Sequence, residues 1–357
     1  KTCRISGAWV NLSRRCRLVA EVPRLVSPTV DVNYAEAVAH YRQGRLPQAE
    51  AALKSALRLA PGNAHVLHLL GMIHQQQGDL SRALERLQQA VGAAPRNAEF
   101  LANLGNALRE AGQLEKAVNA CRQAILLKPD LAYAHNNLGN ALLDLGQAGA
   151  AIEVLQRAIT LQPTLTAAYA NLGFALLQAD RFEAAAAAFQ KLLGQQPGYP
   201  PGYLGLGQAM QALGRLAEAE AAFARAIALH PAYAEAYCAR ANLRRAQGQT
   251  EAAAANFRTA IEQNPRLAIA WCGLGNLQAE QHRADEAIAA YLRAIELNPR
   301  LAEAHDNLGS LYAELGRTDD ALAAARQLIR LSPARAEYWQ RFADRLRGVR
   351  VAEPDGP

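Results

Sequence analysis

Apolar side chains recur along this chain with the period of an amphipathic helix. In one stretch of the chain Tyr169, Leu172, Gly173 and Leu176 stand at the i, i+3, i+4 and i+7 positions of a single helix face. Equivalent stripes return at a fixed interval before and after this one. The pattern therefore predicts a series of similar helices, each with one face committed to packing.

Proline sets the interval, because one proline closes each copy of the pattern and the next follows 34 residues later. The nine prolines are Pro61, Pro95, Pro129, Pro163, Pro197, Pro231, Pro265, Pro299 and Pro333. We number each repeat so that this proline is position 32. The repeats then begin at Val30, Ala64, Ala98, Ala132, Thr166, Pro200, Ala234, Ala268 and Ala302.

Small residues and turn residues complete the repeat. Position 8 is always Gly or Ala, position 20 is always Ala and position 27 is mostly Ala, so two helices can approach closely. Position 15 is glycine in seven repeats, where we expect the first helix to end in the left-handed conformation. The other two repeats carry Asp180 and His282, residue types that are enriched at positive φ. Each repeat is thus predicted to be a helical hairpin.

This register closely resembles the tetratricopeptide repeat family. One repeat carries the family pattern in Trp271, Leu274, Gly275, Ala287, Tyr291, Ala294 and Pro299. The resemblance implies an all-α fold, a right-handed superhelical α-solenoid of antiparallel helix hairpins with nine repeats and a C-terminal capping helix.

The chain divides into four predicted segments. They are a basic non-repeat leader at 1–29 that we expect to be disordered, nine repeats at 30–335, a capping helix at 336–347, and a tail or junction at 348–357. The capping helix is predicted from Trp339, Phe342, Ala343 and Leu346, which stand at positions 4, 7, 8 and 11. A lone first helix is a usual way to cover the last exposed face of a solenoid. Because residue 1 is Lys, we expect the chain to be a fragment or a processed product.

The start of the sixth repeat is irregular. Pro197, Pro200 and Pro201 come close together, and Gly202 and Gly205 each cost a helix about 1 kcal/mol relative to Ala. One interpretation is a soft joint in the array. The other is that stacking on both neighbours compensates for the weak helix.

Charge excludes one class of partner. The net charge is +6, and six basic residues against one acidic residue in 1–29 supply five of these charges. The tail after position 334 supplies the sixth, so the repeats are neutral and we expect no nucleic-acid partner for them. The leader is either a disordered segment or a basic arm for nucleic acid or anionic lipid. The apolar runs of the leader are too short for a membrane span.

Cysteine usage indicates a reducing compartment. Cys238 and Cys272 occupy position 5 of adjacent repeats. Packed helices lie roughly 8–10 Å apart, so these two cysteines are expected to be too far from each other to form a disulfide. We therefore expect reduced cysteines and a cytoplasmic protein. A soft-metal site shared by these two thiols is the alternative, although zinc usually takes four ligands.

Histidine and the known catalytic motifs add no chemistry. His65 and His68 lie three apart without a matching carboxylate or thiol, and His135 and His305 occupy position 4, a packing position where we expect half-buried structural imidazoles. We find no nucleophile elbow, P-loop, zinc-protease motif or dinucleotide-binding turn. The sequence thus predicts a non-enzymatic chain without metal or cofactor.

Asparagine recurs on the helix face opposite the packing stripe. Position 6 carries Asn103, Asn137, Asn171 and Asn307, and position 9 carries Asn106, Asn140, Asn242 and Asn276. Asparagine is a poor helix former, so its repeated use needs a reason. Its amide can donate to and accept from the backbone of an extended peptide whatever that peptide's side chains. These eight residues are the predicted peptide-binding residues, and the alternative is that they bridge or cap neighbouring helices.

The row resembles the asparagine ladder in the repeat arm of O-linked N-acetylglucosamine transferases, which implies that position-6 asparagines hold substrate backbone. Leu69, Gly205, Ala239 and Gly273 interrupt the row at that position. Position 5 never carries Lys, so the clamp for acidic C-terminal tails is absent. Two functions stay open. One is a scaffold that binds protein segments in a concave groove, and the other is the substrate-recognition arm of a larger transferase whose catalytic domain follows Pro357.

Overall fold

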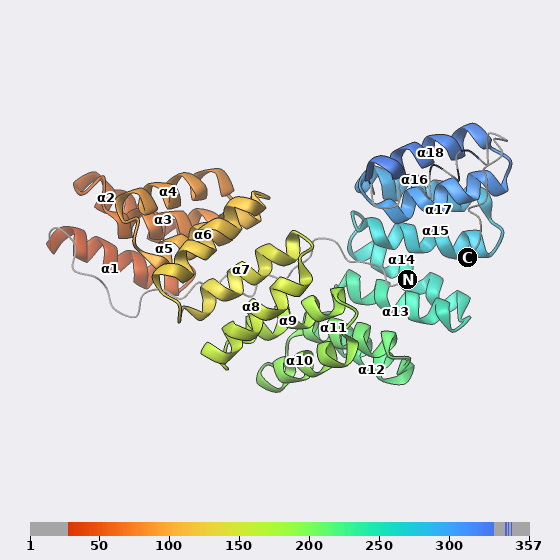
Figure 1. The fold of residues 1–357 in the computed structure, drawn as a ribbon, viewed down its shortest axis with the longest axis horizontal. Coiled ribbons are helices and arrows are strands. Elements are labelled where there is room, and N and C mark those ends of the chain that lie inside the picture. The colour runs from red at the N-terminus through yellow and green to blue at the C-terminus, as the bar shows by residue number, and fades with distance from the viewer. Residues whose placement is uncertain (1–27, 332–339, 341, 343, 345–357) are drawn as a thin grey trace, which may run out of the picture. The chain divides into compact units, whose positions relative to one another are not determined.

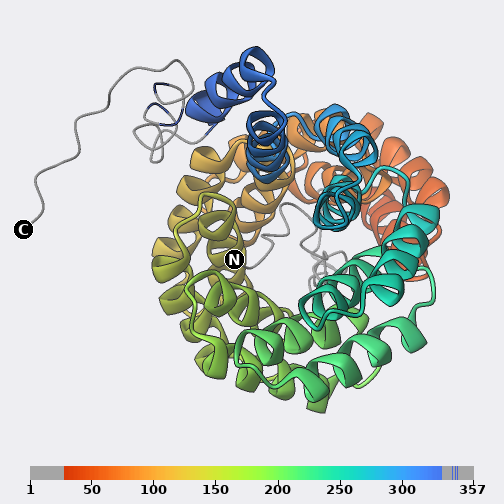
Figure 2. The same ribbon diagram turned by 90° about the vertical axis from the view of Figure 1, so that its right-hand side faces the viewer.

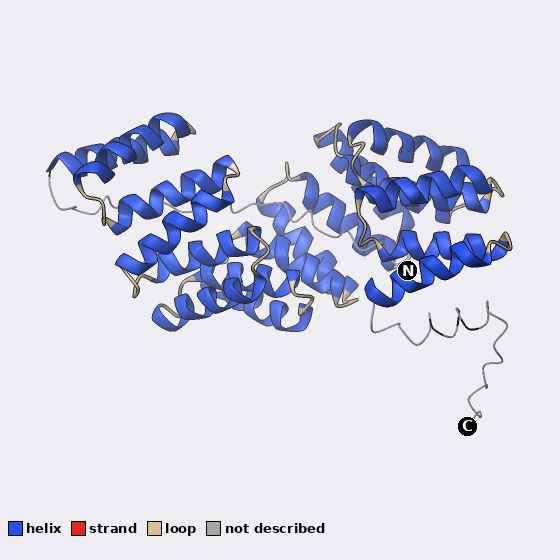
Figure 3. Cartoon of the chain, turned by 90° about the horizontal axis from the view of Figure 1, so that it is seen from above, coloured by secondary structure: helices blue, strands red, loops and turns tan. Residues whose placement is uncertain are grey.

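The computed structural model describes residues 28–331 together with 340, 342 and 344. Within these residues every regular element is an α-helix (Figure 3). The helices pair into nine hairpins, one for each 34-residue repeat (Figure 1). The predicted all-α solenoid of helix hairpins is confirmed.

The chain divides into two compact units between Pro197 and Gly198. The first unit holds α1 Pro28–Arg42, α2 Leu46–Leu59, α3 Ala64–Gln77, α4 Leu80–Ala93, α5 Ala98–Glu110, α6 Leu114–Leu127, α7 Ala132–Asp144, α8 Ala148–Leu161, α9 Thr166–Gln178 and α10 Phe182–Gln195. The second holds α11 Pro200–Ala212, α12 Leu216–Leu229, α13 Ala234–Ala246, α14 Thr250–Gln263, α15 Ala268–Glu280, α16 Ala284–Leu297, α17 Ala302–Glu314 and α18 Thr318–Leu331. The division falls in the irregular segment at the start of the sixth repeat. A soft joint there stays a prediction.

Helix boundaries follow the sequence register closely. From the second repeat onward each first helix begins at position 1 of its repeat, whereas α1 begins at Pro28, two residues before the predicted Val30. Asn63 and Asn97 cap α3 and α5, because their side chains accept hydrogen bonds from two backbone N–H groups of the first turn. All nine position-15 residues have positive φ, including Asp180 at 55° and His282 at 57°. The predicted left-handed ends of the first helices are confirmed.

The small residue at position 8 is a packing requirement. A Cβ added at Gly71, Gly105, Gly139, Gly173, Gly207 or Gly275 would lie closer than 3.0 Å to the position-24 side chain of the same hairpin. Those side chains are Leu87, Cys121, Leu155, Phe189, Phe223 and Tyr291. Each lies across the glycine of the first helix, so the two helices of a hairpin contact at this point.

Within each unit the first helices form the inner row. Consecutive first helices contact one another, and examples are the pairs α5 with α7 and α13 with α15. Each second helix packs on the first helix of its own repeat and on the first helix of the next repeat. Among the helices of 28–331 no two consecutive second helices make a comparably extensive contact. Each row therefore curves with its first helices inside, and its hairpins can be followed by colour in Figure 2.

The capping helix predicted at 336–347 lies mostly outside the described residues, as do the leader and the tail. Phe342 is described, and it packs against Leu322 and Ala325 of α18. The capping helix itself stays a prediction.

Candidate peptide-binding face

The eight predicted asparagines all lie on first helices. The positions are Asn103 and Asn106 on α5, Asn137 and Asn140 on α7, Asn171 on α9, Asn242 on α13, Asn276 on α15 and Asn307 on α17. The two positions of the repeat have different surroundings.

Position 6 links consecutive repeats. The Nδ2 atom of Asn103 lies 2.8 Å from His68 Nε2, Asn137 Nδ2 donates to the carbonyl oxygen of Ala102 at 3.1 Å, and Asn171 Nδ2 donates to Asn136 Oδ1 at 2.9 Å. Each partner stands 35 residues earlier, at position 5 of the preceding repeat. All three asparagines are buried.

Asn307 makes the corresponding link in the second unit. Its Nδ2 donates to Asn276 Oδ1 at 2.7 Å and lies 4.0 Å from the Sγ atom of Cys272, again 35 residues earlier. Asn276 Oδ1 also accepts from the Tyr291 hydroxyl at 2.9 Å. We call Asn103, Asn137, Asn171 and Asn307 the inter-repeat staples. Their contacts are those that the bridging alternative predicts, and a role in binding peptide stays a prediction.

Position 9 has unused hydrogen-bonding capacity. Asn106 is 3% exposed, its Nδ2 donates weakly to Glu110 Oε1 at 3.4 Å, and its Oδ1 is buried without a hydrogen-bond partner. Asn140 and Asn242 are half-buried and make no hydrogen bond to any other described residue. Asn140 and Asn242 therefore offer a ligand the readiest contacts at position 9, because their amides are both accessible and unpaired, whereas Asn106 is buried and Asn276 is engaged.

Two ion pairs cross between first helices in the same register. Arg109 Nη1 lies 2.9 Å from Asp144 Oδ2, and Arg245 pairs with Glu280. Both pairs join position 12 of one repeat to position 13 of the next, 35 residues on. No pattern within a single repeat points to these four residues. A search for opposite charges 35 residues apart on first helices would have found them.

His68 is a buried neutral base. Its ring stacks on Phe100 with centroids 4.3 Å apart, and burial lowers the pKa of His68 to about 3. Its Nε2 is already the partner of Asn103. Among the described residues no group of three or more His, Cys, Asp or Glu side chains could hold a metal ion.

The other histidines and the cysteines have packing roles. His135 and His305 are buried rather than half-buried as predicted, because each Nε2 reaches the carbonyl oxygen of the closing proline before its helix, at 2.9 Å and 3.0 Å. Cys121 lies across Gly105, and burial raises the pKa of this thiol to about 12. Cys238 and Cys272 are buried thiols, and Cys3 and Cys16 lie outside the described residues.

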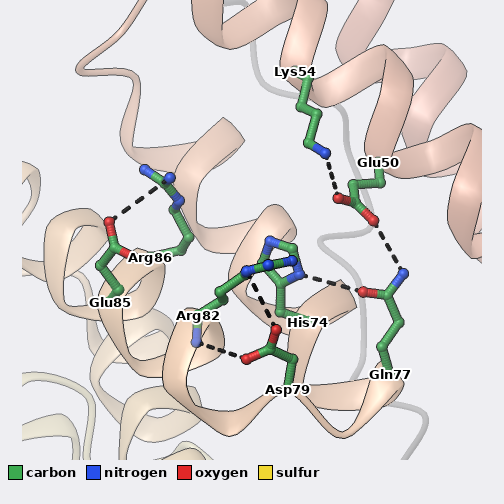
Figure 4. A network of polar contacts seen from close by, with 8 residues as sticks. All are labelled: Glu50, Lys54, His74, Gln77, Asp79, Arg82, Glu85 and Arg86. Carbon is green, nitrogen blue, oxygen red and sulfur yellow. Dashed lines mark hydrogen bonds and ion pairs between the residues drawn. The ribbon is translucent and has the colours of Figure 1, made fainter.

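A polar network joins the first two hairpins (Figure 4). Glu50 on α2 accepts from Gln77 at 3.1 Å and pairs with Lys54 at 2.7 Å, and Gln77 also contacts the buried ring of His74. Hydrogen bonds from Lys54 and Gln77 hold the pKa of the Glu50 carboxyl below its ordinary value. The network includes none of the eight asparagines and has the contacts of a structural element.

Family profiles match nearly all of the hairpins. A profile described as "TPR repeat" matches residues 105–146 and 139–180, and profiles described as "Tetratricopeptide repeat" match 40–106, 176–243, 238–302 and 290–323. The matched segments follow one another with the 34-residue register of the helix pairs. The chain belongs to the tetratricopeptide repeat family.

Solved tetratricopeptide repeat structures share the fold. A tetratricopeptide repeat protein from Parabacteroides merdae ATCC 43184 is 22% identical over 71% of this chain and 100% of its own, with a TM-score of 0.57. PilW, described as a widely conserved type IV pilus biogenesis factor, is 23% identical over 57% of this chain and 95% of its own, with a TM-score of 0.54. Pseudomonas aeruginosa pilF is 20% identical over 58% of this chain and 95% of its own, with a TM-score of 0.52.

These similarities establish the tetratricopeptide repeat fold and leave the partner open. No curated protein matches the chain. None of the described helices combines the length and the apolarity that crossing a membrane requires.

Proposed function

We propose that this tetratricopeptide repeat protein binds an extended segment of a partner protein along the inner row of first helices within a compact unit, without catalytic activity of its own. The carrying observation is the pair of half-buried amides at position 9, Asn140 in the first unit and Asn242 in the second. The side-chain amides of these two residues make no hydrogen bond to other described residues, whereas Asn276 at the same position accepts from Tyr291 and Asn307. Amides so placed can pair with the main chain of a peptide, which always presents both donors and acceptors.

The staples support the same proposal in a second way. Their Nδ2 atoms are committed to the preceding repeat, but the Oδ1 atoms of Asn103 and Asn137 accept no hydrogen bond from any described residue. The staples hold neighbouring first helices in register, and a rigid row lowers the entropic cost of binding. We propose a protein partner, because the repeats are neutral, and a cytoplasmic location, because the described cysteines are buried thiols.

The test starts with the full chain and a random peptide library. Peptides selected on the immobilised protein are synthesised and titrated by calorimetry against the wild type and the double variant Asn140→Ala, Asn242→Ala. We expect affinity to fall up to about tenfold with the fold intact, because a hydrogen bond of roughly 0.5–1.5 kcal/mol is lost in whichever unit holds the peptide.

The matched control is Gln123→Ala with Gln190→Ala, which changes two exposed amides on second helices. This control should bind like the wild type. The proposal is contradicted if the library yields no binder. It is also contradicted if a selected peptide binds the position-9 variant with the same affinity as the wild type.

A further inference from the structure

The packing stripe of the seventh repeat carries two arginines. Position 7 is Leu in seven of the nine repeats but Arg240 in this one, and position 11 is arginine in this repeat alone, as Arg244. Both residues lie on α13 and are half-buried. Because positions 7 and 11 belong to the packing stripe, they stand on the opposite side of the helix from the position-9 amides. The two arginines therefore lie outside the proposed peptide-binding face.

Each arginine contacts a different second helix. Arg240 donates to Asn256 Oδ1 on α14, from Nε at 3.0 Å and from Nη2 at 2.7 Å. Arg244 Nη2 lies 2.9 Å from Glu220 Oε1 on α12. The helices α12 and α14 make no extensive contact with each other, and α13 joins them through its arginines. The cluster thus lies where three helices of the second unit meet.

Arg240 lacks a counterion. Four arginines on the described first helices are half-buried, and three of them pair with a carboxylate. The three pairs are Arg109 with Asp144, Arg244 with Glu220, and Arg245 with Glu280. Arg240 pairs with no carboxylate of a described residue, because its partners are the neutral amide of Asn256 and the ring of Tyr237, whose centroid is 5.6 Å from Cζ. Desolvation by burial and the positive charge of Arg244 lower the pKa of Arg240.

Part of the Arg240 guanidinium is accessible. Its Nη1 atom makes no hydrogen bond to a described residue and is not buried. The neighbouring Arg244 side chain is 27% exposed. A ligand can therefore reach both guanidinium groups from the solvent, on the side of α13 that faces the second helices.

The local charge defines the chemistry of this ligand. Arg240 and Arg244 bring two positive charges and Glu220 one negative charge, so one positive charge is not neutralised. A carboxylate matches this charge and accepts charge-assisted hydrogen bonds, which are stronger than neutral ones. A phosphate monoester carries about −1.5 to −2 charges at pH 7, which exceeds the single positive charge and brings repulsion from Glu220. The cluster therefore fits a carboxylate better than a phosphate.

We propose that Arg240 and Arg244 form a second docking site, on the side of α13 that faces the second helices, for an acidic side chain of a partner protein. Arg240 Nη1 donates to the carboxylate, while Asn256 and Tyr237 hold the guanidinium in place. A guanidinium already fixed by its neighbours loses little further freedom on binding. The site does not depend on the proposed function, which uses the other side of the first helices.

The alternative is that the cluster only joins α12, α13 and α14. The double variant Arg240→Leu, Asn256→Ala tests this, because it introduces the residues that most repeats carry, Leu at position 7 and Ala at position 23. Replacing a buried polar pair by apolar residues that fit the site is often neutral or stabilising. We expect this variant to melt at the wild-type temperature or above it and to lose the docking of acidic peptides. Arg240→Gln, which keeps a polar side chain, should show the same loss and serves if the double variant does not fold.

The experiment selects peptides from a random library on the full chain and discards those that also bind the double variant, which removes peptides held at the inner row. We expect the remaining peptides to contain Asp or Glu. Calorimetry on one such peptide should show about tenfold weaker binding to the double variant, and a similar loss when Asn or Gln replaces its acidic residues.

Two controls accompany this titration. Arg258→Leu removes an exposed arginine of α14 and changes the net charge equally, so it should weaken binding less than about twofold. The variant Asn140→Ala, Asn242→Ala should bind the peptide like the wild type, because its changes lie on the inner row.

The docking site is overturned if no peptide survives the counter-selection, or if the survivors lack Asp and Glu. An equal loss in Arg258→Leu also overturns it, because the attraction would then be general rather than local. Tighter binding after phosphoserine replaces the acidic residue overturns the assignment to a carboxylate. None of these results bears on the inner row, whose own test uses the position-9 variant.

Discussion

The third to fifth repeats of the first unit and the eighth repeat of the second fill the space between consecutive first helices in different ways. In the third to fifth repeats, amide side chains occupy it, and Asn103, Asn137 and Asn171 bond to the repeat before. At the eighth repeat an aromatic ring occupies it, because a Cβ added at Gly273 would collide with Phe257 of the seventh repeat.

The identity of position 8 explains the difference. Glycine there leaves room for the position-24 side chain within its own hairpin, as Gly139 does for Leu155. The seventh repeat has Ala241 instead, and the ring of Phe257 extends toward the next repeat, where position 6 is Gly273. The interruption of the asparagine row at Gly273 is therefore a packing requirement set by the preceding hairpin.

The largest effect should come from breaking this aromatic contact. Phe257 is fully buried, so Phe257→Ala should cost about 3–5 kcal/mol of unfolding free energy. Gly273→Asn should also destabilise, since the ring fills the site, and combining it with Phe257→Leu should recover part of that loss. Urea denaturation followed by circular dichroism measures both. Gly62→Ala is the control, because an added Cβ meets nothing there. Unchanged stability of Gly273→Asn would refute the packing explanation.

Measuring stability against pH tests the amide contact at Asn103 in the first unit. His68, the partner of Asn103, has a folded-state pKa of about 3, below the ordinary value near 6.5. Between these values the unfolded chain binds a proton that the folded chain does not, so stability is full above about pH 6.5 and falls as pH drops. The loss is up to about 1.4 kcal/mol per pH unit. His68→Gln should flatten this dependence, and the exposed His230→Gln should not. Equal slopes in both variants would mean that His68 is not held neutral.

The smallest effect should be the same in both units. Asp180 and His282 adopt the left-handed conformation that glycine adopts at position 15 of the other repeats. Asp180→Gly and His282→Gly should therefore each stabilise the protein by about 1 kcal/mol, by relieving backbone strain. The reverse change, Gly214→Asp, should destabilise by a similar amount. Thermal melting of the three variants checks this, and destabilisation by Asp180→Gly would show that its side chain has a role that the backbone does not reveal.

Much of the fold could be predicted because its signals are local to the repeat. The proline interval placed the helix starts, and position 15 placed the left-handed turns at Asp180 and His282 as well as at glycines. The division at Pro197 and Gly198 falls where clustered prolines and glycines had marked a weak helix.

The surroundings of the asparagines could not be predicted, because they depend on the neighbouring repeat. Positions 6 and 9 lie on the same helix face, yet Asn137 donates a hydrogen bond to Ala102 of the preceding first helix, whereas the side chain of Asn140 hydrogen-bonds to no described residue. That distinction depends on how closely two first helices approach. The Arg109–Asp144 pair escaped notice for the same reason, since its partners lie 35 residues apart on different helices.

The central claim is that position 6 holds the repeats together while position 9 faces the ligand. The most direct test measures unfolding free energy and affinity for a selected peptide on two variants, the triple Asn103→Ala, Asn137→Ala, Asn171→Ala and the double Asn140→Ala, Asn242→Ala. We predict that the triple variant loses about 2 kcal/mol of stability, the net of three buried hydrogen bonds and a gain in helix propensity. Its affinity per folded molecule should change less than that of the double variant, which should keep wild-type stability and bind up to about tenfold more weakly. A triple variant that is as stable as the wild type but no longer binds would contradict the claim and establish position 6 as the binding row.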